Sequence, residues 1–154
     1  MNTTFFYKIA TRVIRKWQVL LGISTLGARA IVLNAEQQVL LVQHTYHSHW
    51  YIPGGGVKKG ESVKAAVLRE LYEEVGLSVI GEPQLLGIYH HRILGVPDYP
   101  VVYLITNFSL SEANSPEIKQ MAWFAYDNLP STTSPGTRRR LDEYFSRTPV
   151  SDAW

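Results

Sequence analysis

Three glutamates near the middle of the chain have a spacing that could support metal chemistry. Glu70, Glu73 and Glu74 lie at positions i, i+3 and i+4 of a predicted helix, so their side chains share one face. Two of them border the apolar stripe of that helix, where like charges repel one another and lose hydration. A hard cation such as Mg²⁺ or Mn²⁺ would compensate, because it takes oxygen ligands and keeps waters for substrate phosphates. The competing interpretation is an acidic helix face in solvent, which is the usual setting of glutamate side chains.

A glycine-rich segment comes directly before this helix. Residues 53–56 read Pro-Gly-Gly-Gly, which predicts a loop, and Gly60-Glu61 follows. Glycine lets the backbone take positive φ angles and approach a ligand closely. A glycine loop alone is more often a tight turn than a phosphate-binding loop, so its meaning depends on what surrounds it.

The glycines and the glutamates together form a longer pattern. Gly55 is followed by five residues, Glu61, seven residues, and then residues 69–77, which read Arg-Glu-Leu-Tyr-Glu-Glu-Val-Gly-Leu. This pattern resembles the Nudix box, the motif of the Nudix hydrolase family, and every defining position matches. The resemblance favours the metal interpretation of the glutamates over the acidic face in solvent.

The resemblance also implies roles for single residues. The metal ligands that it implies are the backbone carbonyl of Gly54 and the side chains of Glu70, Glu73 and Glu74. The residues that it implies to be structural within the site are Gly55, Glu61 and Arg69. An arginine–carboxylate pair can be bidentate and rigid, so a pair between Glu61 and Arg69 would order the loop and leave the other three acids free for Mg²⁺ or Mn²⁺.

The implied reaction is attack of water on a phosphorus atom of a nucleoside diphosphate linked to another group. Metal would neutralise charge in the transition state and lower the pKa of the attacking water. The catalytic residues would include Glu73 and Glu74, and the general base could be one of them or an acid from a later loop. Glu117, which lies six residues before Trp123, matches the place of such an acid in several family members, and Glu112 is its competitor.

The box does not determine the substrate. Candidate substrate contacts are Tyr46, His91, Arg92 and Tyr103. We expect a small nucleotide and no nucleic acid polymer, since a formal net charge of +2 is too small to indicate one. A non-catalytic Nudix domain, acting as a nucleotide sensor or an interaction module, is the alternative function.

Composition narrows the remaining choices. The 154 residues fit one domain. They include no cysteine, which excludes a thiolate zinc site, a cysteine nucleophile and the isoprenoid diphosphate isomerases that share this fold. The absence of cysteine also suits a reducing compartment, and we expect a cytoplasmic location.

The beginning of the chain has a different character. Residues 1–20 are basic, and Phe6, Ile9, Val13 and Trp17 recur at helical spacing, which predicts an amphipathic helix. We expect this helix to dock on the domain formed by residues 21–154 or on a second subunit of a homodimer. Contact with a membrane surface is the less favoured interpretation.

The apolar patterns predict strands that surround one helix. The predicted strands cover residues 27–33, 39–43, 50–52, 85–91, 101–110 and 118–126. The predicted helices cover residues 62–75, where Gly76 ends the helix, and residues 136–146. This order, together with the resemblance, implies an α/β protein of the Nudix type: an α/β/α sandwich with a mixed sheet between helices.

Overall fold

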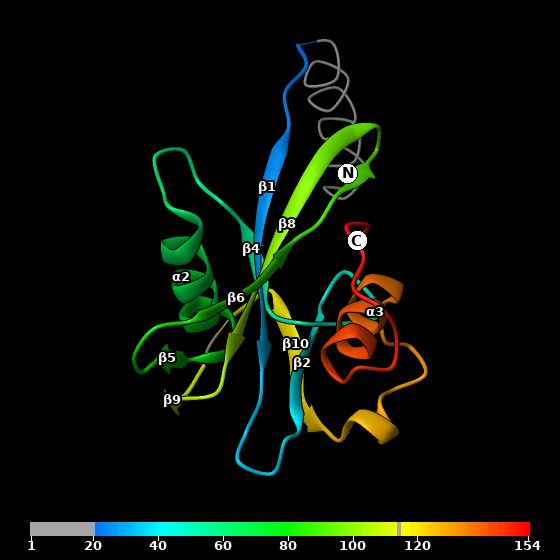
Figure 1. The fold of residues 1–154 in the computed structure, drawn as a ribbon. Helices are drawn as coiled ribbons and strands as arrows, with labels where there is room; N and C mark the ends of the chain where they lie inside the picture. Colours follow the sequence, from blue (N-terminus) through cyan, green and yellow to red (C-terminus); the bar gives the residue numbers. More distant parts are fainter. Residues whose placement is uncertain (1–20, 114) are drawn as a thin grey trace, which may run out of the picture.

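The computed structural model describes residues 21–113 and 115–154, and the predicted N-terminal helix lies outside them. A mixed sheet runs through the centre of the molecule, with the strand order β4-β1-β8-β6 and β7 paired to β8 (Figure 1). Its strands are β1 (Thr25–Val32), β4 (Gly54–Gly56), β6 (Gln84–Ile88), β7 (His91–Ile93) and β8 (Val96–Ile105). β1 and β8 pair in parallel and the other pairs are antiparallel.

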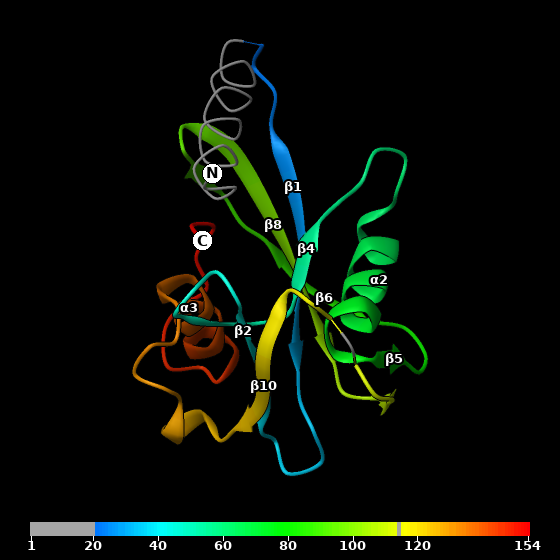
Figure 2. The same cartoon turned by 180° about the vertical axis from the view of Figure 1, so that it is seen from behind.

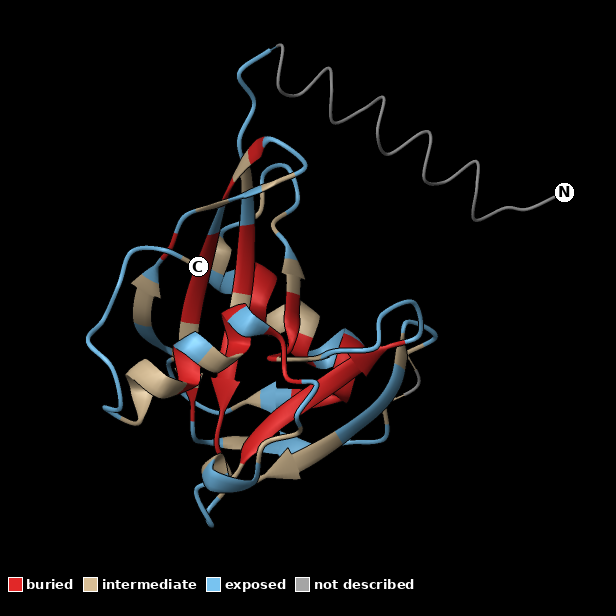
Figure 3. Ribbon diagram, turned by 90° about the vertical axis from the view of Figure 1, so that its right-hand side faces the viewer, coloured by how far each residue is buried: buried red, intermediate tan, exposed pale blue. Residues whose placement is uncertain are grey.

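Two smaller sheets complete the β-structure. β10 (Ile118–Phe124), β2 (Val39–His44) and β3 (Trp50–Tyr51) form one of them, in the order β10-β2-β3. β5 (Leu77–Val79) and β9 (Phe108–Leu110) form the other. β2 is buried at every residue, which places the three-stranded sheet against the centre of the molecule (Figure 3).

One helix covers each face of the central sheet. α2 (Val63–Val75) lies on one side and α3 (Pro135–Tyr144) on the other, after a short 3₁₀ turn, η1 (Tyr126–Asn128) (Figures 1 and 2). Ala28, Ala30 and Val32 of β1 pack with α2, whereas Ile31 and Leu33 pack with Leu141 of α3. The alternation of side chains along β1 therefore builds two separate cores, and it confirms the expected α/β/α sandwich.

Local chemistry explains the limits of α2, the helix that carries the glutamates. The hydroxyl of Ser62 accepts a hydrogen bond from the amide of Ala65, which caps the first turn. Gly76 ends the helix at φ 65°, a conformation that glycine adopts without strain, and its amide donates to the carbonyl of Tyr72. These two ends fix which side chains face the sheet.

The expectation of a loop over residues 53–56 was wrong for its last three residues. Residues 54–56 form β4, which pairs antiparallel with β1. A side chain on Gly54 would collide with the backbone of Ala28, so β4 can approach β1 only because it has no side chains. The three glycines therefore form an edge strand of the central sheet that has no side chains.

The predicted strand over residues 101–110 differs from the structure at both ends. β8 begins earlier, at Val96, although it contains Pro97 and Pro100. It ends at Ile105, and the carbonyl of Asn107 then accepts a hydrogen bond from the amide of Ile80 as the chain enters β9. The predicted strand over residues 85–91 is likewise divided between β6 and β7. No helix of the described residues is long and apolar enough to cross a lipid bilayer.

Candidate active site

The site is built around β4, whose two faces have different neighbours. Gly55 lies opposite Ala28, on the side of α2, and Gly54 lies opposite Arg29, on the side of α3. A side chain at Gly55 would occupy the position of the Glu70 carboxylate, so only glycine lets that carboxylate lie against the strand. The carbonyl of Gly54 accepts a hydrogen bond from the guanidinium of Arg29.

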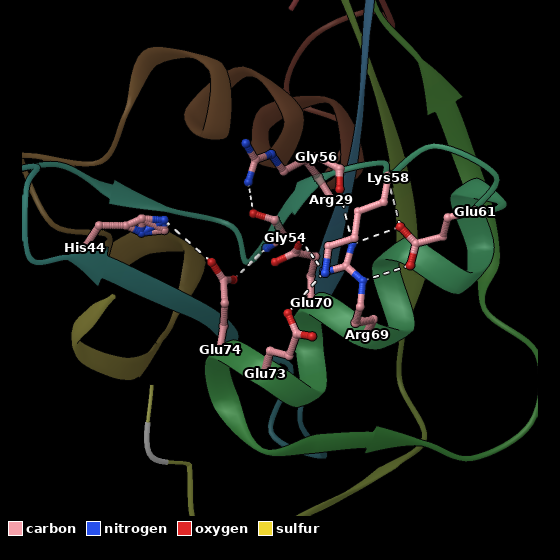
Figure 4. Close-up of polar contacts among 10 residues, drawn as sticks. All are labelled: Arg29, His44, Gly54, Gly56, Lys58, Glu61, Arg69, Glu70, Glu73 and Glu74. Atoms are coloured by element: carbon pink, nitrogen blue, oxygen red, sulfur yellow. Dashed lines mark hydrogen bonds and ion pairs between the residues drawn. The ribbon is translucent and has the colours of Figure 1, made fainter. Parts of the chain in front are cut away.

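Glu74 is the buried carboxylate of the site. Its residue is 7% exposed, and its Oε2 atom accepts a hydrogen bond from the amide of Gly54 at 2.8 Å (Figure 4). His44 Nε2 lies 3.6 Å from the other oxygen. The pKa of Glu74 is raised to about 7, mainly by burial and in smaller part by the charges of Glu70 and Glu117, against the opposing effects of the Gly54 hydrogen bond and Arg29. The site therefore carries excess negative charge around a carboxyl that is removed from water.

Arg69 organises the other acids of the helix. Its Nε and Nη2 atoms donate to the two oxygens of Glu61 at 2.8 and 2.9 Å, so the pair is bidentate (Figure 4). Nη1 donates to Glu70 at 2.7 Å and to Glu73 at 3.1 Å. Hydrogen bonds from Arg69 and from the amide of Lys58 lower the pKa of Glu61 to about 2. The contacts tie the loop after β4 to α2.

A first cavity, of about 480 Å³, opens over these acids. The side chains that line it include Lys58, Arg69, Glu70, Glu73, Glu74 and Glu117. Glu117 is an exposed turn residue directly before β10, and its carbonyl accepts a hydrogen bond from the amide of Thr45. Its competitor Glu112 is also exposed but does not line this cavity. Glu117 is therefore the later acid that shares a cavity with the box glutamates.

Carboxylate and carbonyl oxygens at this cavity are the donors that Mg²⁺ and Mn²⁺ prefer. The burial of Glu74, which raises its pKa, is the observation that supports the fit, because a cation would compensate the carboxylate for its lost hydration and for the charges of Glu70 and Glu117. Within the described residues, no three histidine, aspartate or glutamate side chains are already grouped as ligands, since Glu70 and Glu73 contact Arg69 instead. The residues thus have the chemistry of a magnesium site, with two carboxylates held by arginine.

A second cavity, of about 390 Å³, lies on the α3 side of β4. The residues that line it include Arg29, Tyr51, His91, Asp98, Thr137 and Trp154, together with Gly55 and Gly56 of β4. Asp98 is 8% exposed; it accepts a hydrogen bond from the hydroxyl of Thr25, and its Oδ2 atom lies 2.8 Å from His91 Nε2. β4 therefore lines the second cavity, while its residues Gly54 and Gly55 lie against Glu74 and Glu70, which line the first.

The four candidate substrate contacts lie in different places. His91 lines the second cavity, whereas Arg92 is exposed and donates to the carbonyl of Gly95. Tyr46 is exposed beside His44 in the turn between β2 and β3. Tyr103 packs against the core on the α2 side of β8, because it lies five residues along the strand from Asp98 and so has the opposite orientation. The structure brings only His91 of these four to the second cavity.

Sequence reasoning missed several residues that line the two cavities. The sequence could have pointed to Arg29 as a functional residue, since it is the one charged residue in the apolar strand β1. Asp98 had a weaker signal, because it is flanked by two prolines that suggest a turn rather than a strand. Trp154 had none, since its neighbours in space, Tyr89 and His91, are more than sixty positions away along the chain.

Comparison with known proteins gives consistent matches. The family model described as NUDIX domain matches residues 24–145. A candidate 8-oxo-dGTP diphosphatase of Bacillus subtilis is 31% identical over 120 residues, which cover 78% of this chain and 79% of that protein. An RNA pyrophosphohydrolase of Histophilus somni is 42% identical over 126 residues, but the match covers only 58% of that protein and 80% of this chain. The crystal structure of a MutT NUDIX hydrolase from Burkholderia pseudomallei superimposes with a TM-score of 0.69 at 29% identity, covering 77% of this chain and 96% of that one.

Proposed function

Because this chain belongs to the Nudix hydrolase family, we propose that it uses divalent metal to hydrolyse a phosphoanhydride bond in a nucleoside diphosphate linked to another group. The observation that carries the proposal is the pair of cavities on either side of β4, since β4 lines one of them and contacts the glutamates that line the other. One is lined by the box glutamates and the other has the size of a small-molecule site, which is roughly 300–1,000 Å³. The diphosphate would lie at the first cavity and the nucleoside in the second.

The proposed metal, Mg²⁺ or Mn²⁺, would be held by the carbonyl of Gly54 and by Glu70, Glu73 and Glu74. When bound, it supplies neutralisation of phosphate charge and a more acidic water. Gly54 has a second role here, because its amide holds Glu74 in position while its carbonyl faces Arg29. Carbonyl oxygen has two lone pairs, so the contact with Arg29 leaves one for a further partner.

Two further residues of the first cavity would act on the substrate directly. Lys58 lines the cavity and offers a positive charge to the phosphates. We assign Glu117 as the general base, since it shares the cavity with the glutamates and lies on a turn that can adjust when substrate binds. The attacking water would give its proton to the Glu117 carboxylate, and the leaving phosphate would depart toward Lys58.

A small nucleotide is the substrate class that we favour. The match to the candidate 8-oxo-dGTP diphosphatase supports it, because this match covers most of both chains. The match to an RNA pyrophosphohydrolase covers little more than half of that protein, and it makes an RNA 5′ end the second candidate. A panel of nucleoside triphosphates, an oxidised nucleotide and a short 5′-triphosphate RNA would separate the two classes.

The proposal is tested by metal-dependent release of phosphate or diphosphate from that panel. We expect turnover with Mg²⁺ or Mn²⁺, none with EDTA, and a severe fall in kcat for Glu73→Gln and Glu74→Gln. Glu82→Gln is the matched control, because Glu82 is exposed and pairs with Lys64 outside both cavities. Binding of nucleotides without any turnover would instead support the sensor or interaction module. Turnover unaffected by EDTA or by both substitutions would disprove the metal mechanism.

A further inference from the structure

We propose that residues 151–154 are part of the substrate site and that Trp154 provides the aromatic surface against which a nucleobase stacks. The inference rests on the proposed function, since that function makes the ligand of the second cavity a nucleotide. It assigns a residue that determines affinity for the base, distinct from the residues that handle the phosphates. Three features of the structure support it: the backbone pairing of the segment, its anchor on α3 and the position of the indole.

The backbone of residues 151–154 is held along the edge of the central sheet. The amide of His90 donates to the carbonyl of Asp152 at 2.7 Å, and the amide of Trp154 donates to the carbonyl of His90 at 3.0 Å. These two bonds make a parallel bridge between His90 and Ala153. His90 lies between β6 and β7, next to the cavity residue His91. The segment therefore extends the sheet beside the second cavity, near the position marked C in Figure 1.

Arg140 anchors the same segment from the side of α3. It is 1% exposed, its Nη1 atom donates to the carbonyl of Ala153 at 2.8 Å, and its guanidinium lies 3.8 Å from the centre of the Tyr89 ring. Nη2 donates to Glu143 at 2.6 Å, and Glu143 also accepts from the amide of Ser151 at 3.0 Å. A buried arginine needs such partners, because an unpaired charge there would be strongly destabilising. Residues 151–154 are thus tied to α3 through Arg140 and Glu143.

This anchoring leaves the indole of Trp154 half-buried at the cavity wall. Its ring centre lies 6.0 Å from that of Tyr89 and 6.1 Å from that of His91. The Arg140 guanidinium lies 5.6 Å from the ring centre, and Gly136 of α3 is also adjacent, so that any side chain there would collide with the indole nitrogen and the carbons beside it. These contacts fix the orientation of the ring, and Trp154 lines the second cavity together with Tyr51.

The chemistry of this wall suits a nucleobase. A base stacks on an aromatic side chain through its flat face, and such stacking tolerates different bases. Polar groups lie at the cavity as well, since Asp98, His91 and Arg29 line it with Trp154. A ribose phosphate without a base would reach the glycine strand without needing the indole. The two classes of ligand should therefore respond differently to loss of the ring.

Calorimetric titration with two ligands in the presence of Mg²⁺ tests the inference. A nucleoside monophosphate carries the base, and ribose 5-phosphate does not. For Trp154→Ala we expect the Kd of the monophosphate to rise roughly 10-fold to 100-fold, which is the usual effect of losing one stacking contact with a base. The Kd of ribose 5-phosphate should stay unchanged. Trp154→Phe should keep most of the affinity. Tyr72→Ala, which removes an exposed aromatic ring on α2, is the matched control.

Gly136→Ala provides a second test that leaves the tryptophan in the chain. The added carbon would displace the indole, so this variant should bind the monophosphate more weakly, as Trp154→Ala does, and bind ribose 5-phosphate with unchanged affinity. In turnover, both variants should raise KM for nucleotides and leave kcat nearly unchanged, because the ring does not touch the reacting phosphates.

Two results would overturn the inference. Equal losses of affinity for both ligands would show that Trp154 only holds the fold together, and unchanged affinity for both would show that the base binds elsewhere. In either case a wild-type protein that still hydrolyses nucleotides would leave the proposed function intact. A wild-type protein that neither hydrolyses nucleotides nor binds monophosphates would instead overturn the proposed function.

Discussion

The backbone amide of Gly54 donates a hydrogen bond to the side chain of Glu74, with 2.8 Å between the nitrogen and Oε2. This bond joins the glycine strand β4 to the helix α2 across the site. Glu74 is buried at this point, and burial raises its pKa to about 7 although the hydrogen bond from Gly54 opposes the rise. The chain therefore holds an acid whose charge is costly in the absence of a cation.

The first prediction concerns stability without metal. The folded chain holds the Glu74 proton more tightly than the unfolded chain, since the pKa is about 7 instead of 4.5. Protonated Glu74 therefore contributes about 3 kcal/mol to the free energy of unfolding. This contribution is fully present below about pH 4.5 and is lost as the pH rises through about 7. Glu74→Gln does not titrate, so it should lack this loss. Urea unfolding of both EDTA-treated proteins between pH 4.5 and 8 measures how the free energy of unfolding changes with pH. The same change with pH in the wild type and in Glu74→Gln would contradict the prediction.

Two adjacent glycines of β4 should respond in opposite ways to alanine. A side chain at Gly55 would displace the Glu70 carboxylate, whereas one at Gly56 would enter open space. We therefore expect Gly55→Ala to lower kcat at least 10-fold, about 1.4 kcal/mol in transition-state free energy, while Gly56→Ala stays close to wild type. Steady-state kinetics with Mg²⁺ on both variants checks this. Similar activities for both would mean that the Glu70 carboxylate does not need its place against β4.

Loss of the Glu61–Arg69 pair should disturb the loop as well as the rate. Glu61→Gln removes the charge from a bidentate contact, so we expect a lower Tm, faster amide exchange over residues 57–61 and reduced kcat. Because the pKa of Glu61 is lowered to about 2, its contribution to stability is present above about pH 4.5 and disappears as the pH falls toward 2. Loss of metal binding with an unchanged Tm and exchange pattern would identify Glu61 as a ligand instead.

Replacement of the proposed base should affect proton transfer more than metal binding. Glu117→Gln should reduce kcat by roughly 10²–10⁴-fold, the usual contribution of a general base. The pH–rate profile should also lose its acidic limb, while the affinity for Mg²⁺ changes much less. Glu112→Gln is the control, since Glu112 lies outside the cavity of the box glutamates. A Glu117→Gln enzyme of near-normal kcat would return the role to a box glutamate.

The last prediction concerns the predicted helix in residues 1–20. Deletion of residues 1–17 should lower the stability or change the oligomeric state, because the stripe of Phe6, Ile9, Val13 and Trp17 is expected to cover protein surface. Thermal unfolding and analytical ultracentrifugation of the full-length and shortened chains measure both properties. Equal stability and assembly, together with binding of the full-length chain to anionic vesicles, would favour the membrane interpretation.

The parts of the fold that local chemistry specifies could be predicted from the sequence. The helix α2 lies where its cap residues Ser62 and Gly76 place it, and its glutamates share one face as their spacing requires. β2 also follows its apolar run, and its residues contribute to both cores. In these segments, propensity, pattern and capping agree with one another.

The remaining features depend on contacts between distant segments. β4 is a strand because β1 lies beside it, and three glycines carry no strand propensity of their own. β8 begins before Pro97 because β7 folds back on it, although proline usually excludes a strand interior. The second cavity could not be predicted for the same reason, since its walls come from β1, β3, β4, β7, β8, α3 and Trp154.

The thinness of β4 has a consequence for how this protein could diverge. A strand without side chains separates the carboxylates of α2 from the cavity on the side of α3, and none of the described residues lines both cavities. Substitutions at His91, Thr137 or Trp154 could then alter which molecule is accepted without disturbing the acids that we propose to act in hydrolysis. Selection can act on the two compartments separately, and one conserved chemistry can serve a succession of different substrates.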